Sequence, residues 1–368
     1  MSMTASVIDT HDGLDGLEDR WERLRKECGA GIYSSYFLTR SWLENYRAVS
    51  SPRIVLVEEH GELVGLAPLA VHTHRSGRLS VNVLALAGRV AGRLFISPST
   101  ILLRPGRDDA LEPMLKAMRG MDWSFLSAIY MEDIHPASRF IEVAGRTWRP
   151  EPHPENSLVI LSLPEGDISA MYEAGARRSF EKRSRALERG GHKVSLRKVA
   201  SEDLDRAVET YARQHIERWE NKGGSYFRNP ENVLFLRSAL KEAALRNKSF
   251  AHEILIDGEV AAQNFGFVEG DRAYSYRLGM NDAFARYSPG WMVKHFGMTD
   301  LRDNGVIKCD FGVGEEKFKT MMGGTTIPLI GFRASRGLMS LLSRAQSIKE
   351  RFERREHSSS RADVGPNA

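Results

Sequence analysis

The chain has 368 residues, of which 42% are hydrophobic and 27% are charged, as in ordinary globular proteins. Its formal net charge of +4 is too small to imply nucleic acid binding, and it is equally compatible with an anionic small ligand. The two cysteines, Cys28 and Cys309, exclude a disulfide framework or a cysteine-rich metal site, and they favour a reducing compartment.

The first residues and the length of the apolar runs argue against a secreted or membrane-spanning protein. The first residues lack the basic start and apolar stretch of a secretory signal. The longest apolar runs are shorter than the ~20 residues that cross a bilayer. Residues 344–368 are charged and poor in apolar side chains, which predicts a frayed helix followed by disorder. We therefore expect a cytoplasmic protein.

The first half of the chain reads as helices followed by strands. Apolar residues at helical spacing predict helices over residues 14–27 and in the segment FLTRSWLENYRAV. Two alternating apolar runs around His60-Gly61 predict a β-hairpin, and further strands, a helix and the strand WSFLSAIYME follow. The proline-rich stretch RPEPHPEN at 149–156 predicts a boundary after an N-terminal unit at 1–150.

The second half repeats this order over residues 151–343. It begins with a basic helix that ends in two glycines, and two amphipathic helices, DLDRAVETYARQHIERWEN and VLFLRSALKEAALRN, come next. Three strands with turns at Asp257-Gly258 and Glu269-Gly270 follow. A loop, a helix, the strand VIKCDFGV, a short helix and a closing strand, TTIPLIGFRA, complete the predicted unit.

The two hairpins, one in each half, have the same pattern. Gly61-Glu62 and Gly258-Glu259 occupy matching places, each after two or three helices. Hairpins of this kind also occur in unrelated proteins, but the helices that precede both of them favour a duplicated α/β unit.

The order of elements in the second half resembles the GNAT-type N-acyltransferase fold. Five motifs in register also resemble the CelD-like, BioF-type acetyltransferase family, which is similar to two fused GNAT units and related to Fem-type peptidyltransferases: GARRSFEKRSRALERGG, HIERW, DGEVAAQ, YSPG and DFGVGEEKFK. With FLTRSWLENY and the hairpin containing LVGLAPL, the resemblance covers about residues 15–335. It implies an α/β (α+β) fold of two tandem GNAT-like units, each with a mixed central sheet flanked by helices. We expect the N-terminal unit to lack a cofactor site.

The segment RYSPG is the expected cofactor site. In the GNAT fold, the loop after the fourth strand opens a helix whose backbone N–H groups bind the pyrophosphate of coenzyme A. Proline is tolerated at such a helix start, and glycine permits close approach of the ligand. The resemblance implies acetyl-CoA or another acyl-CoA as co-substrate, no metal, and cofactor contacts from Arg286, Tyr287, Ser288, Pro289 and Gly290. The alternative is that SPG only starts a helix.

A histidine in the predicted helix DLDRAVETYARQHIERWEN is a candidate general base. His215 suits this role because imidazole titrates near neutral pH and could deprotonate an amine. Tyr211 and Arg218 lie four residues before and three after it, so they can share its face and bind substrate. The alternative is an amphipathic helix whose polar face happens to carry a histidine.

Two strands carry candidate substrate-binding side chains. Gln263 and Asn264 in AAQNFGF could hydrogen-bond the pantetheine or the acceptor, although a polar pair in a half-buried strand is an equal alternative. Tyr274 and Tyr276 point to one face of the next strand because their spacing is two, and they could line an acceptor cleft. Core aromatics are the alternative.

The stretch CDFGVGEEKFK contains the Asp-Phe-Gly of protein kinases, but no His-Arg-Asp catalytic loop precedes it. It resembles the Asp-Phe-x-x-Gly-Glu/Asp-x-x-Tyr/Phe-Lys element of the CelD-like and Fem-like families. That resemblance implies catalytic roles for Asp310, Glu315 and Lys319: the lysine could reach donor phosphates or the acceptor, and a carboxylate could hold it or act as base. A structural lysine–carboxylate network is the alternative. Phe318 stands where many GNAT enzymes place a tyrosine that protonates the leaving thiolate.

Three functions remain open. The first is acyl-CoA-dependent transfer, in its simplest form N-acetylation, by direct attack of an amine on the thioester; the resemblance implies an amino sugar, polysaccharide or cell-envelope precursor as acceptor. The second is a Fem-like transfer from aminoacyl-tRNA, and the third is a non-catalytic scaffold of an exopolysaccharide synthesis complex. We expect a small-molecule or glycan acceptor and no nucleic acid partner, because the basic residues of the helix at 177–189 spread around it.

Overall fold

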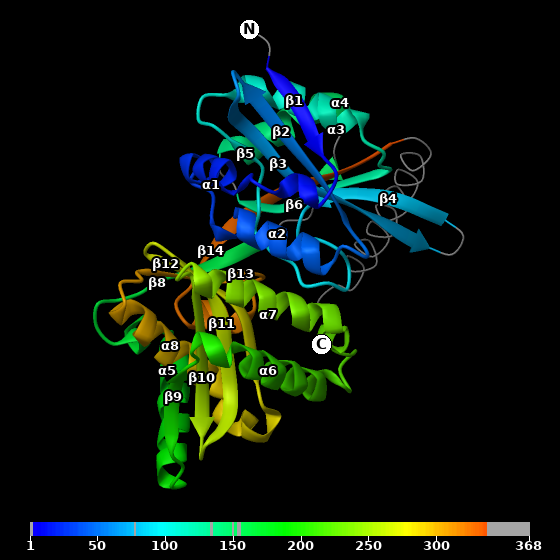
Figure 1. Cartoon of the computed structure of the whole chain (residues 1–368). Coiled ribbons are helices and arrows are strands. Elements are labelled where there is room, and N and C mark those ends of the chain that lie inside the picture. The colour runs from blue at the N-terminus through cyan, green and yellow to red at the C-terminus, as the bar shows by residue number, and fades with distance from the viewer. Residues whose placement is uncertain (1–2, 77–78, 133–134, 149–150, 153–155, 337–368) are drawn as a thin grey trace, which may run out of the picture.

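The computed structural model describes residues 3–76, 79–132, 135–148, 151–152 and 156–336. The predicted tail at 344–368 and most of the predicted boundary at 149–156 lie outside these residues. Within them, fourteen strands form one mixed sheet with helices on its faces (Figure 1). The predicted α/β architecture is confirmed.

The strands of the first half are β1 (Thr4–Ile8), β2 (Ser51–Glu59), β3 (Glu62–Ser76), β4 (Leu79–Leu86), β5 (Leu102–Leu103), β6 (Phe125–Glu132) and β7 (Glu151–Pro152). Those of the second half are β8 (Asn156–Ser162), β9 (Val194–Lys198), β10 (Ser249–Ile256), β11 (Glu259–Glu269), β12 (Arg272–Met280), β13 (Lys308–Val313) and β14 (Thr325–Ser335). Along the sheet their order is β1-β2-β3-β4-β6-β14-β8-β13-β12-β11-β10-β9, while β5 pairs with β3 and β7 with β14.

The α-helices among the described residues are α1 (Glu18–Glu27), α2 (Tyr36–Asn45), α3 (Leu111–Gly120), α4 (His135–Trp148), α5 (Ala174–Arg189), α6 (Leu204–Trp219), α7 (Pro230–Leu245), α8 (Pro289–Asp303) and α9 (Lys317–Met321). Their starts follow local signals. In α7, for example, the Asn229 side chain accepts a hydrogen bond from the N–H of Glu231, and Pro230 occupies the first turn.

The two halves contain the same arrangement of strands, as the matching hairpins predict. The antiparallel strands β2, β3 and β4 are followed by a parallel pairing of β4 with β6, and β10, β11 and β12 are followed by a parallel pairing of β12 with β13. Both hairpins turn through two residues of positive φ, His60-Gly61 and Asp257-Gly258. The predicted duplication is therefore present in the fold.

The closing strand β14 differs from the prediction. It was expected to complete the second half, but it lies between β8 of that half and β6 of the first half, antiparallel to both. The strands β1 and β8 were also not predicted. In Figure 1 the strands of the first half lie above those of the second, and β14 runs between them.

The helices α2 and α7 join the halves on one face of this sheet (Figure 1). The hydroxyl of Tyr46 donates a 2.7 Å hydrogen bond to Asn232, and the rings of Tyr46 and Phe235 lie 5.4 Å apart. Ser238 contacts Asn45 and Ser41 of the opposite helix. One hydrophobic cluster contains buried residues of both helices, so the core continues from one half to the other.

An irregularity in β12 shapes the region where the strands separate. The register between β11 and β12 shifts between Phe265 and Gly266, and Tyr276 is the extra residue of this bulge. An ideal Cβ on Gly266 would lie 2.1 Å from the carbonyl oxygen of Tyr274 and 2.5 Å from the ring of Phe250. Only a residue without a side chain fits there.

Replacing Gly266 with alanine should therefore lower the free energy of unfolding by about 3 kcal/mol, because backbone atoms must move to accept the methyl group. Urea unfolding followed by circular dichroism measures this change. Gly175→Ala in α5 is the matched control, since nothing lies within 4 Å of its ideal Cβ, and we expect a change within about 0.5 kcal/mol. Equal stability of the two variants would contradict the proposed crowding.

Candidate active site

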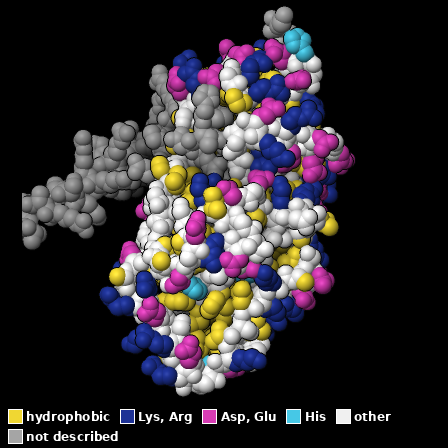
Figure 2. All heavy atoms as spheres, turned by 90° about the vertical axis from the view of Figure 1, so that its left-hand side faces the viewer, with side chains coloured by type: hydrophobic (Ala, Val, Ile, Leu, Met, Phe, Trp, Pro, Cys, Tyr) yellow, Lys and Arg dark blue, Asp and Glu magenta, His cyan; other side chains and the backbone are white. Residues whose placement is uncertain are grey.

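A cavity of about 600 Å³ opens where β12 and β13 move apart. Its walls come from β12, the last turn of α6, the first turns of α8, and β13 with α9. The first half contributes Tyr33, Phe95 and Ser97. In Figure 2, hydrophobic side chains gather on the lower half of the face where α5 and α8 lie in Figure 1, with basic and acidic side chains around them. The cavity has the size of a site for a small ligand or co-substrate.

The separation of β12 and β13 creates this space. The two strands pair in parallel over only three positions, the last of which joins Tyr274 to Asp310. Beyond it, β12 contains the bulge at Tyr276, and β13 shifts its register with β8 between Asp310 and Val313. Backbone groups that neighbouring strands would otherwise pair can therefore face a ligand.

The first turn of α8 closes one end of the cavity. Ser288 has φ 53° and ψ 55°, a left-handed conformation that turns the chain into the helix, and Pro289 follows as the first helical residue. Ser288 and Gly290 line the cavity, and the nearest atoms to an ideal Cβ on Gly290 are 3.9 Å away. The positive end of this fifteen-residue helix thus faces the cavity, where it favours an anion.

The other residues of RYSPG have different surroundings. Tyr287 is buried, and its hydroxyl lies 2.9 Å from Nε2 of His192. Arg286 is exposed, with its guanidinium 4.6 Å from the centre of the Tyr287 ring. Pro289 is buried and is not among the described residues that line the cavity.

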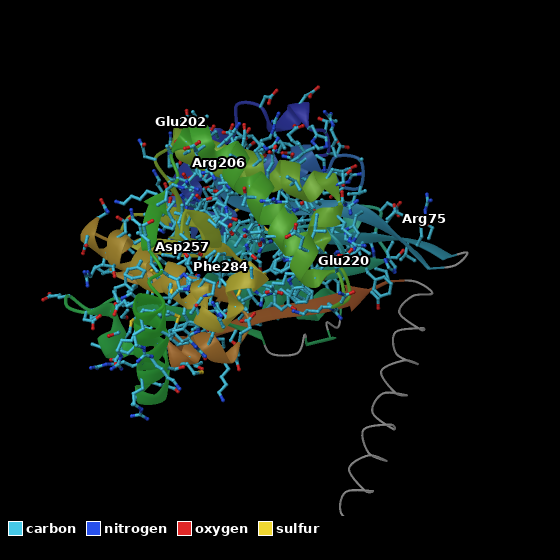
Figure 3. The ribbon with its side chains drawn as sticks, turned by 90° about the horizontal axis from the view of Figure 1, so that it is seen from below. Arg75, Glu202, Arg206, Glu220, Asp257 and Phe284 are labelled. Carbon is cyan, nitrogen blue, oxygen red and sulfur yellow. The ribbon has the colours of Figure 1, made fainter. Side chains whose placement is uncertain are left out.

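The last turn of α6 forms a second wall. In Figure 3, Arg206 marks the start of this helix and Glu220 marks its end. His215 and Arg218 line the cavity from this turn. Nδ1 of His215 lies 2.8 Å from Oγ of Ser225, and burial together with the charges of Arg277 and Arg218 lowers the pKa of His215. Burial and both charges therefore favour the neutral imidazole.

Tyr211 shares the face of His215, as predicted from spacing, but it packs inside the core. Its ring contacts Phe227 and Phe265 and lies 2.6 Å from the ideal Cβ position of Gly279. Gln263 is also fully buried, where its amide donates to the carbonyl of Ala207 and to Glu253. Neither side chain is among the described residues of the cavity wall. Of the candidate acceptor contacts, Tyr276 does line it.

The stretch CDFGVGEEKFK forms the floor of the cavity and the turn from β13 into α9. Asp310 is 1% exposed and accepts from Arg272 at 2.6 Å and from the N–H of Gly312 at 2.7 Å. Nζ of Lys319 donates to the carbonyl oxygens of Gly312, Val313 and Gly314 at 3.0–3.2 Å. Asp310 is thus held by an arginine, and the lysine–carboxylate contact that the sequence left as an alternative joins Lys319 to Glu316 instead.

The two glutamates of this stretch have different environments. Glu315 accepts a hydrogen bond from Ser157 of β8 and lies outside the described cavity wall. Glu316 lines the cavity and forms a 2.6 Å ion pair with Lys319. Phe318 also lines it, so no hydroxyl stands at that position.

In total, the structure brings six of the predicted site residues to one cavity: His215, Arg218, Tyr276, Ser288, Gly290 and Lys319. It places seven others outside the described wall: Tyr211, Gln263, Arg286, Tyr287, Pro289, Asp310 and Glu315.

Sequence reasoning missed a lysine in α8. Lys294 is 3% exposed and lines the cavity, donates to Oγ of Ser275, and lies 4.1 Å from the centre of the Phe311 ring. Burial lowers its pKa to about 7. The available signal was a lysine on the apolar face of the helix WMVKHFGM, where the residues three and four positions later, Gly297 and Met298, are buried.

Sequence reasoning also missed the contribution of the first half. The hydroxyl of Tyr276 donates to the carbonyl of Phe95 at 3.0 Å, and this contact joins the two halves at the rim. Arg277 lies 4.0 Å from the centre of the Tyr276 ring and 5.8 Å from that of Phe95, and no ion pair joins it to a carboxylate of the described residues.

The described residues contain no group of three or more histidine, cysteine or acidic side chains placed to hold a metal ion. Among the same residues, every helix is too short or too polar to cross a membrane. Both cysteines are free thiols.

One region of the chain matches a family model, and the fold is similar to that of several solved structures. Residues 174–320 match a family model described as an acetyltransferase (GNAT) domain. This region holds the second set of antiparallel strands, α8 and most of the cavity wall. No curated protein matches the sequence significantly.

Solved structures similar to the chain span nearly all of it. FemX matches with a TM-score of 0.58 at 11% identity, over 91% of this chain and 98% of FemX. A tandem GNAT protein from the clavulanic acid biosynthesis pathway matches with a TM-score of 0.51 at 14% identity, over 91% of this chain and 99% of that one. L-PGS from Bacillus licheniformis matches with a TM-score of 0.50 at 11% identity, over 87% of this chain and 93% of L-PGS. At these identities the likeness establishes the fold, which is the GNAT type in tandem.

Proposed function

We propose that the protein is an acyl-CoA-dependent acyltransferase of the CelD-like, BioF-type kind, which moves an acyl group, in the simplest case acetyl, from the thioester to an amine. The cavity supports this proposal most directly, because it lies at the separation of β12 and β13 with the start of α8 at one end. A helix start favours phosphate, and an opening between strands accommodates an extended chain. The match of residues 174–320 to an acetyltransferase domain agrees with it.

The residues at the donor end fit a coenzyme A thioester. The left-handed turn at Ser288 starts α8 at the cavity, and Gly290 adds no side chain there, so a phosphate could approach the backbone N–H groups. Among the described lining residues, Arg218, Arg277 and Lys319 carry positive charge, and Glu316 is the one carboxylate. A cavity with this excess of positive charge suits a donor that carries phosphates.

The acceptor is proposed to enter between the two halves, past Phe95 and His215. Arg277 has no carboxylate partner among the described residues, and its guanidinium is held by the carbonyl of Tyr276 at 3.0 Å. Such a group would bind an anionic part of the acceptor. We therefore propose a small-molecule or glycan amine with a negative charge, such as an amino sugar or a cell-envelope precursor. With two free thiols, a cytoplasmic location belongs to the same proposal.

Thermal denaturation with acetyl-CoA, longer acyl-CoAs and free coenzyme A tests the donor. A ligand that binds only the folded state stabilises it by about 2.7 kcal/mol at one hundred times its Kd, so Tm should rise by several degrees. Free adenosine is the control, because it lacks both the phosphates and the pantetheine arm. If coenzyme A and its thioesters leave Tm unchanged while aminoacyl-tRNA supports a ribonuclease-sensitive transfer, the donor is an aminoacyl-tRNA instead.

A further inference from the structure

Lys294 lines the cavity from α8, in surroundings unlike those of Lys319, the other lysine of the described wall. Its Nζ donates to Oγ of Ser275, and this hydroxyl donates in turn to Oδ1 of Asn264 at 2.7 Å. The face of Phe311 covers the group on another side at 4.1 Å. Ser275 therefore holds Nζ between β12 and β13. The hydrogen-bonding positions of Nζ that Ser275 does not use are open to the cavity.

The charged groups around Lys294 do not include a free carboxylate. On β13, Asp310 is paired with Arg272 and with the N–H of Gly312, and Cys309 is a buried thiol whose pKa burial raises to about 12. On α9, Lys319 carries a further positive charge toward the site.

The other neighbouring elements do not supply one either. On β12 the cavity-facing charge is Arg277, and β11 contributes the neutral Asn264. From the first half, Tyr33 faces the site with a pKa that burial raises well above its ordinary value, so it stays protonated. On α8 itself, His295 contacts Tyr172, and its pKa is lowered chiefly by burial.

This environment favours the neutral amine at physiological pH. Burial is the largest effect on the pKa of Lys294 and lowers it to about 7; the charge of Lys319 acts in the same direction, and Cys309 and Asp310 oppose it. About half of the molecules at pH 7 would thus carry a lone pair on Nζ that can accept a proton.

We propose that Lys294 is the catalytic residue that transfers the proton during acyl transfer, an inference that rests on the proposed function. As the nitrogen of the acceptor amine forms its bond to the thioester carbonyl carbon, neutral Nζ of Lys294 takes a proton from that nitrogen. The carbonyl–sulfur bond then breaks, and the resulting ammonium returns the proton to the leaving thiolate. The products are an amide and a free thiol, and Lys294 ends neutral.

The other polar groups of the cavity are less suited to this task. The ammonium of Lys319 directs hydrogen bonds to three carbonyl oxygens and pairs with Glu316, and Phe318 has no proton to give. His215 stacks on Trp219 and contacts Ser225 on the opposite wall. Lys294 alone among these combines burial, a single hydrogen-bond partner within the described residues and access to the cavity.

Competitive labelling with trace acetic anhydride tests the state of Lys294 without knowledge of the acceptor. The full chain is labelled between pH 6 and 10, and mass spectrometry follows each lysine. We expect acetylation of Lys294 to rise with a midpoint near pH 7, and the exposed Lys308 serves as the reference lysine in the same chain. Bound coenzyme A should protect Lys294 and leave Lys308 unchanged. A midpoint for Lys294 above pH 9 would overturn the assignment.

Substitutions then test the role in turnover, measured as thiol release from acetyl-CoA with the amine that the wild type acylates fastest. Lys294→Met should lower kcat by about 10²–10⁴-fold and remove the rise in rate through pH 7, with coenzyme A affinity within threefold. Lys294→Arg should be as inactive as Lys294→Met, because arginine cannot give up its proton. If the positive charge at this position were all that turnover needed, Lys294→Arg would keep its activity. Lys308→Met is the matched control.

The possible failures are distinguishable. If coenzyme A does not raise the Tm of the wild type, the proposed function fails and this role fails with it. If coenzyme A raises the Tm of both proteins and Lys294→Met keeps its turnover, only the role of Lys294 is overturned.

Discussion

Replacing Arg25 with methionine is expected to lower the free energy of unfolding by about 3–5 kcal/mol, the largest loss of stability that we expect from one substitution. Arg25 is 1% exposed, and it joins α1 of the first half to the end of β11 in the second. It donates to Glu22 and Glu269 at 2.7–3.0 Å and to the carbonyl of Ala30 at 2.8 Å. Without the guanidinium, the carboxylate of Glu269 keeps only Lys248 as an ionic partner among the described residues.

Urea unfolding at pH 7 measures this loss, and Arg40→Met provides the control. Arg40 pairs with Asp15 and Glu44 on a more exposed surface, so its replacement should cost about 1 kcal/mol or less. A loss of less than 1 kcal/mol for Arg25→Met would contradict the proposed coupling of the halves.

The ion pair of Arg25 with Glu269 also predicts that the free energy of unfolding depends on pH in the acid range. Burial raises the pKa of Glu269, but its hydrogen bonds and charge interactions with Arg25 and Lys248 outweigh burial and lower it overall. The stabilisation is therefore present above the unfolded pKa of about 4.3 and is lost as pH falls through the lower folded value. Arg25→Met should lose less stability than the wild type over that acid range.

Replacing Gly290 with glutamate is expected to weaken coenzyme A binding by at least about 100-fold. The new carboxylate would occupy the start of α8, neutralise the positive end of the helix and repel phosphate. Isothermal titration calorimetry with coenzyme A measures the affinity.

Gly290→Ala separates this charge effect from a packing effect. The nearest atoms to its ideal Cβ, on Leu278 and Met280, are 3.9 Å away, so the methyl group fits without movement. We expect affinity within about threefold of the wild type. Wild-type affinity in Gly290→Glu would place the phosphates elsewhere, whereas equal losses in both variants would point to packing alone.

The parts of the fold that the sequence predicted are those with local causes. The hairpins at His60-Gly61 and Asp257-Gly258 follow from two-residue turns between alternating strands, and the helices follow from apolar spacing and caps. The position of β14 has no such local cause. Its residues alternate like any strand, and only pairing with β6 and β8, more than 150 residues earlier in the chain, decides where it lies.

The same distinction applies to the candidate site. Ser288 and Gly290 were predicted because a helix start is a local feature. Asp310 was given a catalytic role, but its carboxylate is bound by Arg272 across a strand pairing that the sequence does not reveal. Lys294 and Phe95 were missed because burial and the contact between halves place them at the cavity.

The place of β14 also constrains the order in which the chain can fold during synthesis. Strand β6 leaves the ribosome about two hundred residues before β14, so its edge stays unpaired while the second half is being made. The edge of β8 that pairs with β14 also stays unpaired until β14 has been made. The two hairpin units can form early, but the sheet becomes continuous only when Thr325–Ser335 inserts between them. Nascent chains that stop before this point would present two unpaired strand edges to their neighbours, so exposure to aggregation is greatest until β14 has been made.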